Sequence, residues 1–271
     1  MSTFIGIDFS GGARPWKEHV REPTVWLAFV GDLGDRLSLN KLLPVQALEG
    51  NGSAFDRLVA LLAAGAYEVA AIDAPFSLPV AHLPQGSHSE LILNVRALPN
   101  GLDRPFPTGA SIVTLGEMVA PKTELKPLRQ TETYWKSRGV NTRSTMWNGP
   151  RGGAPFAAAC LCLIERSQRP CWPWSEFQPG ILCEAFPAAQ LHHWGLPCTK
   201  YSGFAGQSTR ERIFNGIRNR LVVNAHHAET ILRSADALDA VVATFAAVAV
   251  AKRSVVAFDA THPDGFIAVA P

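Results

Sequence analysis

Carboxylate side chains occupy unusual positions in this sequence of 271 residues, because they stand within or at the end of apolar stretches. Asp8 closes the stretch TFIGID shortly before two glycines, and Asp73 closes YEVAAID just before a proline turn. Glu184 lies inside GILCEAF, while Asp236 and Asp239 share one face of a predicted late helix because they are three residues apart. Burying an acid in an apolar element is costly unless the acid is paired or bound to a cation.

Clusters of carboxylate oxygens suit Mg²⁺ or Mn²⁺ better than zinc. Two such ions about 4 Å apart can activate a water and stabilise the leaving oxygen of a phosphodiester. We expect Asp8 to bridge two ions and Asp73 and Asp239 to hold one each. Asp236 and Glu184 then complete the metal shell or orient water. Each acid alone has an ordinary alternative as a turn residue, a helix-start acid or an arginine partner, so the case for a metal site depends on the order of Asp8, Asp73, Asp236 and Asp239 along the chain.

The elements that must position these acids follow from hydrophobic patterning. Short apolar runs with β-branched residues predict strands, and the helical spacing over residues 53–64, with Ser53 as N-cap and Gly65 as stop, predicts a helix between two of them. A long helix is expected over residues 228–253. This strand–helix–strand order indicates an α/β fold. The predicted strands are residues 3–9, 24–30, 36–45, 67–73, 180–186 and, at the end of the chain, 265–269.

Composition limits the class of protein. Hydrophobic residues make up 47% of the chain and charged residues 18%, which is ample material for a core and argues against disorder. The net charge of +2 excludes a histone-like tail protein. The five cysteines form no CxxC pair, which argues against a disulfide framework or a structural zinc site. We find no signal peptide and no apolar run near the roughly 20 residues of a membrane span, so we expect a soluble, cytoplasmic protein without a membrane partner.

A basic stretch with interleaved aromatic residues occupies residues 122–151. It carries seven Lys or Arg against two Glu, a net charge of +5. Basic side chains for phosphates beside aromatic faces for bases are typical of single-strand nucleic-acid binding. The alternative is an ordinary solvated surface with the aromatic residues in the core. The expected nucleic-acid-binding residues are Lys126, Arg129, Trp135, Lys136, Arg138 and Arg143.

Several short motifs run the length of the chain in an order that resembles the uncharacterised family of predicted RNase H-like nucleases. The RNase H-like plan places an acid on the first strand, an acid on the fourth strand and one or two in a late helix. The DALDA motif also looks like the late helix of RuvC-type junction resolvases. The motifs are GIDFSGG (6–12), IDAPFSLP (72–79), CEAFPAA (183–189), KYSG (200–203), DALDA (236–240) and DGFI (264–267).

The resemblance implies an RNase H-like mixed five-stranded sheet flanked by helices, in a single domain over residues 1–271. A large helical and loop insertion is then expected at about residues 76–151. The resemblance also implies a Mg²⁺- or Mn²⁺-dependent nuclease that hydrolyses phosphodiester bonds of RNA or DNA by a two-metal-ion mechanism. The acids that it brings together are Asp8, Asp73, Glu184, Asp236 and Asp239.

Two other functions stay open at this point. The chain can be a non-catalytic RNase H-like module that binds nucleic acid, with structural acids hydrogen-bonded to arginines. It can also be an actin- or sugar-kinase-like phosphotransferase that binds a nucleotide, since GIDFSGG is compatible with the phosphate loop of that fold. That fold usually needs two such domains, and 271 residues with one such motif leave little room for them.

Overall fold

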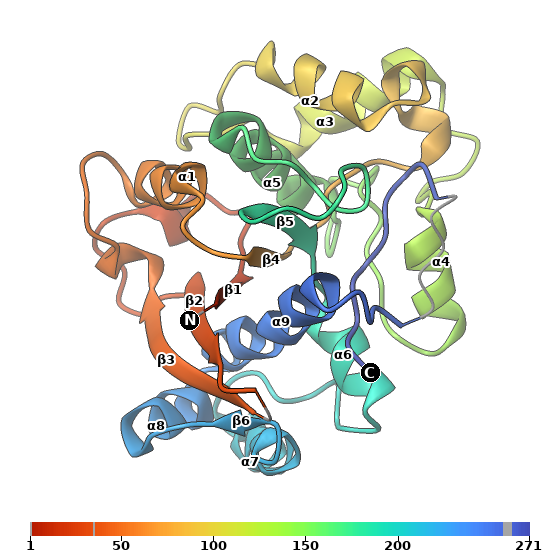
Figure 1. Cartoon of the computed structure of the whole chain (residues 1–271). Helices are drawn as coiled ribbons and strands as arrows, with labels where there is room; N and C mark the ends of the chain where they lie inside the picture. The colour runs from red at the N-terminus through yellow and green to blue at the C-terminus, as the bar shows by residue number, and fades with distance from the viewer. Residues whose placement is uncertain (1, 35, 257–261) are drawn as a thin grey trace.

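The computed structural model describes residues 2–34, 36–256 and 262–271 and has a mixed α/β architecture (Figure 1). In the described part of the chain, strands form one sheet in the order β5-β4-β1-β2-β3-β6. β1, β2 and β3 are antiparallel neighbours, whereas β4 and β5 run parallel to β1. The bounds are β1 Thr3–Asp8, β2 Trp26–Asp32, β3 Leu37–Pro44, β4 Val69–Asp73, β5 Ile181–Glu184 and β6 Leu221–Val222.

The edges of the sheet differ from expectation. The sheet has six strands where five were expected, because the two-residue β6 adds to the outer edge at β3. The strand predicted over residues 265–269 is reduced to one isolated bridge between Ala185 and Ala268. Its backbone still contacts the sheet, since the amide of Ala268 donates to the carbonyl of Glu184.

The predicted long C-terminal helix is two helices. Ser234 has an extended backbone, and its side chain accepts a hydrogen bond from the amide of Ala237, so a new helix begins there. No single helix among the described residues has the length and apolar composition to span a membrane; α8 and α9 pass that test only together, bent by 114° at their break. The helices are α1 Ala54–Ala64, α2 His88–Arg96, α3 Gly109–Val119, α4 Gln130–Ser137, α5 Ala154–Ser167, α6 Pro187–His193, α7 Gln207–Ile217, α8 Ala225–Arg233 and α9 Ala235–Ala251.

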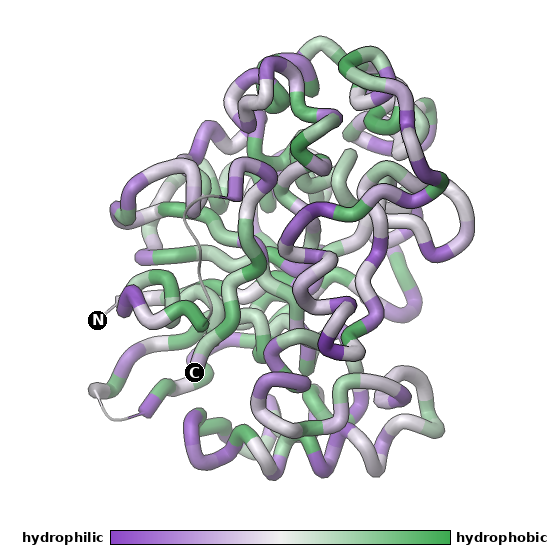
Figure 2. Tube along the Cα trace, turned by 90° about the vertical axis from the view of Figure 1, so that its right-hand side faces the viewer, coloured by the Kyte–Doolittle hydropathy of each residue, from purple (hydrophilic) through white to green (hydrophobic). Residues whose placement is uncertain are grey.

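Helices cover both faces of the sheet. α9 lies across one face, and α1 and α5 pack on the other (Figure 1). A side chain at Gly6 of β1 would meet the backbone of α9, with its Cβ only 2.1 Å from the carbonyl oxygen of Ala240. The absence of a side chain there and the small residues of α9 therefore allow the helix backbone to lie directly on β1. The middle of the molecule is mostly hydrophobic, and hydrophilic segments lie mainly along the outer loops (Figure 2).

The segment over residues 76–151 packs in two places. α2 and α3 join the core beside α5 through apolar residues such as Leu91 and Ile112 (Figure 1). Trp135 of α4 and the following Val140 pack instead with α6 and the end of the chain. The second half of this segment therefore lies next to the edge of the sheet where β1 and β4 end.

Candidate metal centre

Asp8 and Asp73 are the last residues of two parallel neighbouring strands. They are direct partners in the register of β1 with β4, so their backbones lie side by side. Side chains alternate between the two faces of a strand. Gly6 contacts α9, and Val69 and Ala71 pack in the core beneath α9, so Asp8 and Asp73 both belong to the α9 side of the sheet.

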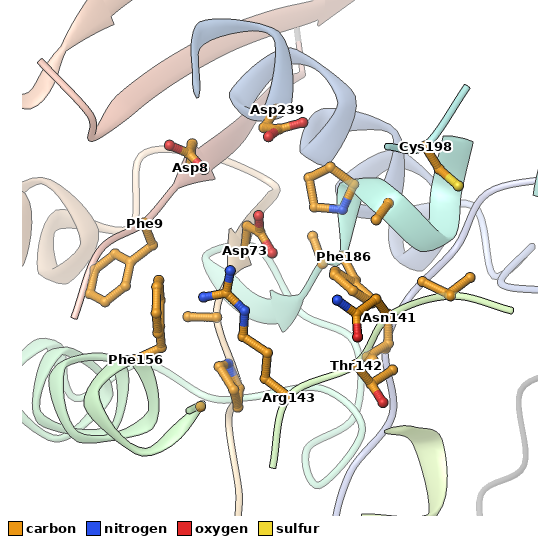
Figure 3. Close-up of a pocket in the computed structure, with 18 of the residues that line it drawn as sticks. Asp8, Phe9, Asp73, Asn141, Thr142, Arg143, Phe156, Phe186, Cys198 and Asp239 are labelled. Atoms are coloured by element: carbon orange, nitrogen blue, oxygen red, sulfur yellow. The ribbon is translucent and has the colours of Figure 1, made fainter. Parts of the chain in front are cut away.

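Asp239 comes from α9 and completes the cluster. Because α9 starts at Ser234 and lies directly on β1, its second turn passes over the ends of the two strands. One carboxylate oxygen from each of Asp8, Asp73 and Asp239 lies within 4.8 Å of the other two. Figure 3 shows the three carboxylates around a common space. Asp236, one turn earlier in α9, lines the same cavity.

The electrostatics of the cluster are those of like charges held together out of water. Burial, reinforced by Asp239 and Asp73, raises the pKa of Asp8 well above its usual range. Burial and Asp73 do the same to the pKa of Asp239. Burial raises the pKa of Asp73 to about 7 although nearby Arg143 opposes the rise, and burial raises the pKa of Asp236 to about 6. An all-oxygen donor set with excess negative charge fits a hard divalent cation.

The carboxylates line a cavity of about 570 Å³. One wall is the segment 140–143, and the opposite wall is the segment 198–202 that follows α6. Figure 3 shows the side chain of Arg143 extending toward Asp73. Its guanidinium carbon lies 5.1 Å from the centre of the Phe156 ring, so an aromatic face supports this cation. The site therefore combines carboxylates for a metal with a guanidinium that can bind a phosphate oxygen.

Tyr201 is a site residue to which sequence reasoning gave no role. Its hydroxyl donates to Asp239, 3.0 Å from Oδ1 and 3.3 Å from Oδ2. The buried Arg210 donates in turn to the carbonyls of Tyr201 and Gly203 and fixes this segment. The signal was present in the KYSG motif at 200–203, which carried part of the family resemblance without an assigned function.

Glu184 lies close to this cluster but has a different partner. Leu182 of β5 packs in the α5 core, so alternation places Glu184 on the α5 side of the sheet. Arg129, at the start of α4, binds both of its oxygens at 2.6 and 2.7 Å, and the amide of Phe76 donates to it at 3.0 Å. Arg129 also binds Glu132 at 2.9 Å. In the structure Glu184 is therefore paired with an arginine, which is the alternative that the sequence analysis left open for it.

A family model matches this chain over residues 6–262. The chain belongs to the DUF429 family, described as proteins of unknown function. A search of the curated proteins found no match, and neither did a search of the solved structures. The match to DUF429 spans the three carboxylates, both walls of the cavity and the Glu184–Arg129 pair.

The residues expected to bind nucleic acid fall into two groups in this DUF429 chain. Arg129 and Trp135 are buried, at 1% and 2% exposure, and support the inner structure of the segment. The remaining four are exposed, and aromatic rings lie against three of their charged groups: Trp147 under Lys126, Tyr134 under Arg138 and Phe156 under Arg143. The exposed residues are Lys126, Lys136, Arg138 and Arg143.

Proposed function

We propose that this chain is a metal-dependent nuclease with an RNase H-like fold that hydrolyses phosphodiester bonds of RNA or DNA with two Mg²⁺ or Mn²⁺ ions. The observation that carries the proposal is the convergence of Asp8, Asp73 and Asp239, whose oxygens lie within 4.8 Å of one another. Carboxylates at this separation repel one another unless protons or cations balance them. Because all the ligand atoms are oxygens, a divalent cation is the counter-charge that this site favours.

The order of the acids in the fold supports the RNase H-like assignment. Asp8 ends the first strand, Asp73 ends the fourth strand and Asp239 lies in the last helix. This is the plan of the superfamily that the sequence resembles. The mixed sheet flanked by helices agrees with that plan, with β6 as an addition at its edge.

In this proposal the residues of the cavity have different roles in phosphodiester hydrolysis. Asp8, Asp73 and Asp239 would hold the ions, which when bound supply an activated water and stabilise the charge on the leaving oxygen. The Arg143 guanidinium, which extends into the cavity, binds a non-bridging oxygen of the phosphate and orients it for attack from the side of the carboxylates. Asp236 accepts a hydrogen bond from the attacking water and so orients it.

Exposed bases near the cavity provide the proposed nucleic-acid surface. Lys126, Lys136 and Arg138 belong to the same segment as Arg143, and each is open to solvent. Such residues bind phosphates without reading the sequence, and their contribution weakens with salt. Trp135 is left out of the proposed contacts because it is buried in the support of this wall. Arg129 and Glu184 line the cavity but are left out because they bind each other.

The experiment that tests the function is a cleavage assay with labelled RNA, DNA and branched DNA in Mg²⁺ or Mn²⁺. We expect cleavage of at least one substrate, and we expect Asp8→Asn to lower its rate by about 100-fold or more because one metal ligand is lost. The matched control is Asp103→Asn, since Asp103 is an exposed acid whose ion-pair partner among the described residues is its neighbour Arg104. Cleavage of no substrate, or equal cleavage by Asp8→Asn, contradicts the proposal.

A further inference from the structure

The KYSG motif builds a fixed loop at the mouth of the cavity. Lys200 has a left-handed backbone with φ 60°, which is uncommon for a residue with a side chain, and Gly203 has φ 66°. Hydrogen bonds from two side chains fix this backbone conformation. Tyr201 binds Asp239, and Arg210, only 3% exposed, binds the carbonyls of Tyr201 and Gly203 and that of Leu232.

The anchored loop presents a cation and an aromatic ring outward. Lys200 is exposed and lines the cavity, as does Ser202. Phe204, two residues further, is 92% exposed. A large apolar ring on a held loop beside a positive charge is a surface on which a base can stack while its phosphate is bound. Since Tyr201 is fixed to Asp239, this surface has a defined position relative to the carboxylates.

The opposite wall offers polar groups rather than a second aromatic platform. Asn141 and Arg143 are exposed and line the cavity (Figure 3). The hydroxyl oxygen of Thr142, between them, is buried and has no hydrogen-bond partner within the described ranges. Asn141 and Arg143 are therefore the groups of this wall that can reach a ligand in the cavity.

The carboxylates thus lie on the floor of a cavity between two walls. Asp8 is only 8% exposed and lines the cavity together with segments 140–143 and 198–202, so a scissile phosphate that reaches it through the cavity passes beside both segments. A duplex carries its backbones on a stiff body with its bases stacked inside. A single strand bends, and its unstacked bases are free to stack on protein rings.

We propose that the substrate of this site is single-stranded nucleic acid, held between segment 140–143 and loop 198–204, with a base next to the scissile phosphate stacked on Phe204. The inference rests on the proposed phosphodiesterase function and specifies its substrate. Arg143 and Lys200 contact phosphates on opposite sides of the strand, and Asn141 faces the nucleotide at the cut site. The chemistry is shared by RNA and DNA, which the test separates.

The test compares one labelled oligonucleotide of about 15 nucleotides, as RNA and as DNA, with the same sequence in a blunt duplex. Binding is measured by fluorescence anisotropy with Ca²⁺, and cleavage is measured separately with Mn²⁺. We expect the single strand to bind and to be cleaved at least about tenfold better than the duplex. Phe204→Ala weakens single-strand binding about five- to tenfold, whereas Phe204→Tyr, which keeps a stacking ring, retains it.

Leu102→Ala is the matched control, since it removes another fully exposed apolar side chain and is expected to change nothing. Equal binding of duplex and single strand, binding of neither, or full single-strand binding by Phe204→Ala overturns the inference. Cleavage of duplex as fast as single strand also overturns it but leaves the nuclease function standing. Selective single-strand binding without cleavage supports the inference about the ligand and contradicts the nuclease function.

Discussion

Two groups of buried acids line the same cavity, and they differ in what balances their charge. Glu184 and Glu132 share Arg129, which binds both with distances of 2.6 to 2.9 Å. The carboxylates of the candidate metal centre lie within 4.8 Å of one another, yet none has a Lys or Arg ion-pair partner in the part of the chain that the structure describes. Among the Lys and Arg side chains of the described residues, Arg143 alone lowers the pKa of one of these acids, Asp73.

The difference separates acids with a built-in counter-charge from acids that could hold a cation. A buried acid that a protein keeps for packing is expected to have its counter-charge built in, as Glu184 does. Acids without an internal counter-charge raise the free energy of the folded state in the absence of a ligand. Such a free-energy cost is typical of binding and catalytic sites, because a cation that binds there removes the repulsion and is therefore held strongly. The two groups should therefore respond to charge removal with opposite signs.

The largest effect is expected from Arg129→Met, which leaves two buried glutamates without their shared partner. Breaking a buried ion pair by removing one member costs about 3–5 kcal/mol of unfolding free energy. Chemical denaturation followed by tryptophan fluorescence measures the loss. The control is Arg138→Met, an exposed arginine at the end of α4, with an expected change within about 0.5 kcal/mol. A loss below about 1 kcal/mol for Arg129→Met would mean that the pair is not a structural support.

A smaller effect of opposite sign is expected from Asp8→Asn in EDTA. The folded-state pKa values of the cluster lie above the unfolded value near 3.9, with that of Asp73 at about 7. The folded protein therefore binds more protons than the unfolded chain between pH 4 and 7, and the cluster's contribution to stability falls as pH rises through that window. Removing one charge at pH 8 is expected to stabilise the metal-free protein by roughly 1–3 kcal/mol.

The measurement is the unfolding free energy at several pH values between 4 and 8, with and without Mn²⁺. The wild type should lose stability toward pH 8 in EDTA more steeply than Asp8→Asn. Added Mn²⁺ should stabilise the wild type most at high pH, where protons no longer compete for the carboxylates. Asp8→Asn should gain little from Mn²⁺. Equal pH slopes for the two proteins, or equal stabilisation by the metal, would remove the distinction between the two groups.

Much of the metal centre was predictable from the sequence because it depends on local pattern. Asp8 and Asp73 each end an apolar run, and parallel neighbouring strands end at one edge of a sheet, so their meeting follows from the strand pattern and the family resemblance. The position of Asp236 and Asp239 on one face of a helix follows from their spacing of three residues. The start of α9 just after Ser234 was missed, because a single capping residue within a continuous helical pattern gives a weak signal.

The remaining features depend on contacts between distant parts of the chain. Glu184 was grouped with the catalytic acids because the sequence shows its strand but not which face of the sheet it occupies. Its partner Arg129 is 55 residues away and was itself expected on the surface. The sixth strand has two residues and no pattern of its own. The role of Tyr201 needed the position of Asp239, since tyrosine in a loop has no preferred function.

The smallest effect is expected from Tyr201→Phe, which tests whether the metal centre is positioned by a neighbour. The hydroxyl of Tyr201 lies 3.0 Å from Asp239 and opposes the rise in the pKa of that carboxyl. Without this hydrogen bond the carboxylate loses its fixed orientation and holds a proton more tightly, so Mn²⁺ affinity should fall by about tenfold, with a larger fall at lower pH. Isothermal titration calorimetry at two pH values measures both effects.

Tyr67→Phe is the matched control for this loss. The hydroxyl of Tyr67 is also buried and also donates a hydrogen bond, but to the carbonyl of Leu62 at the end of α1. Both variants should lose similar stability, because each loses one buried hydrogen bond. Only Tyr201→Phe should lower the affinity for Mn²⁺ and make that affinity more dependent on pH. If both variants bind Mn²⁺ like the wild type, the carboxylates are positioned by the sheet and α9 alone, and the loop anchored through Tyr201 is independent of the metal.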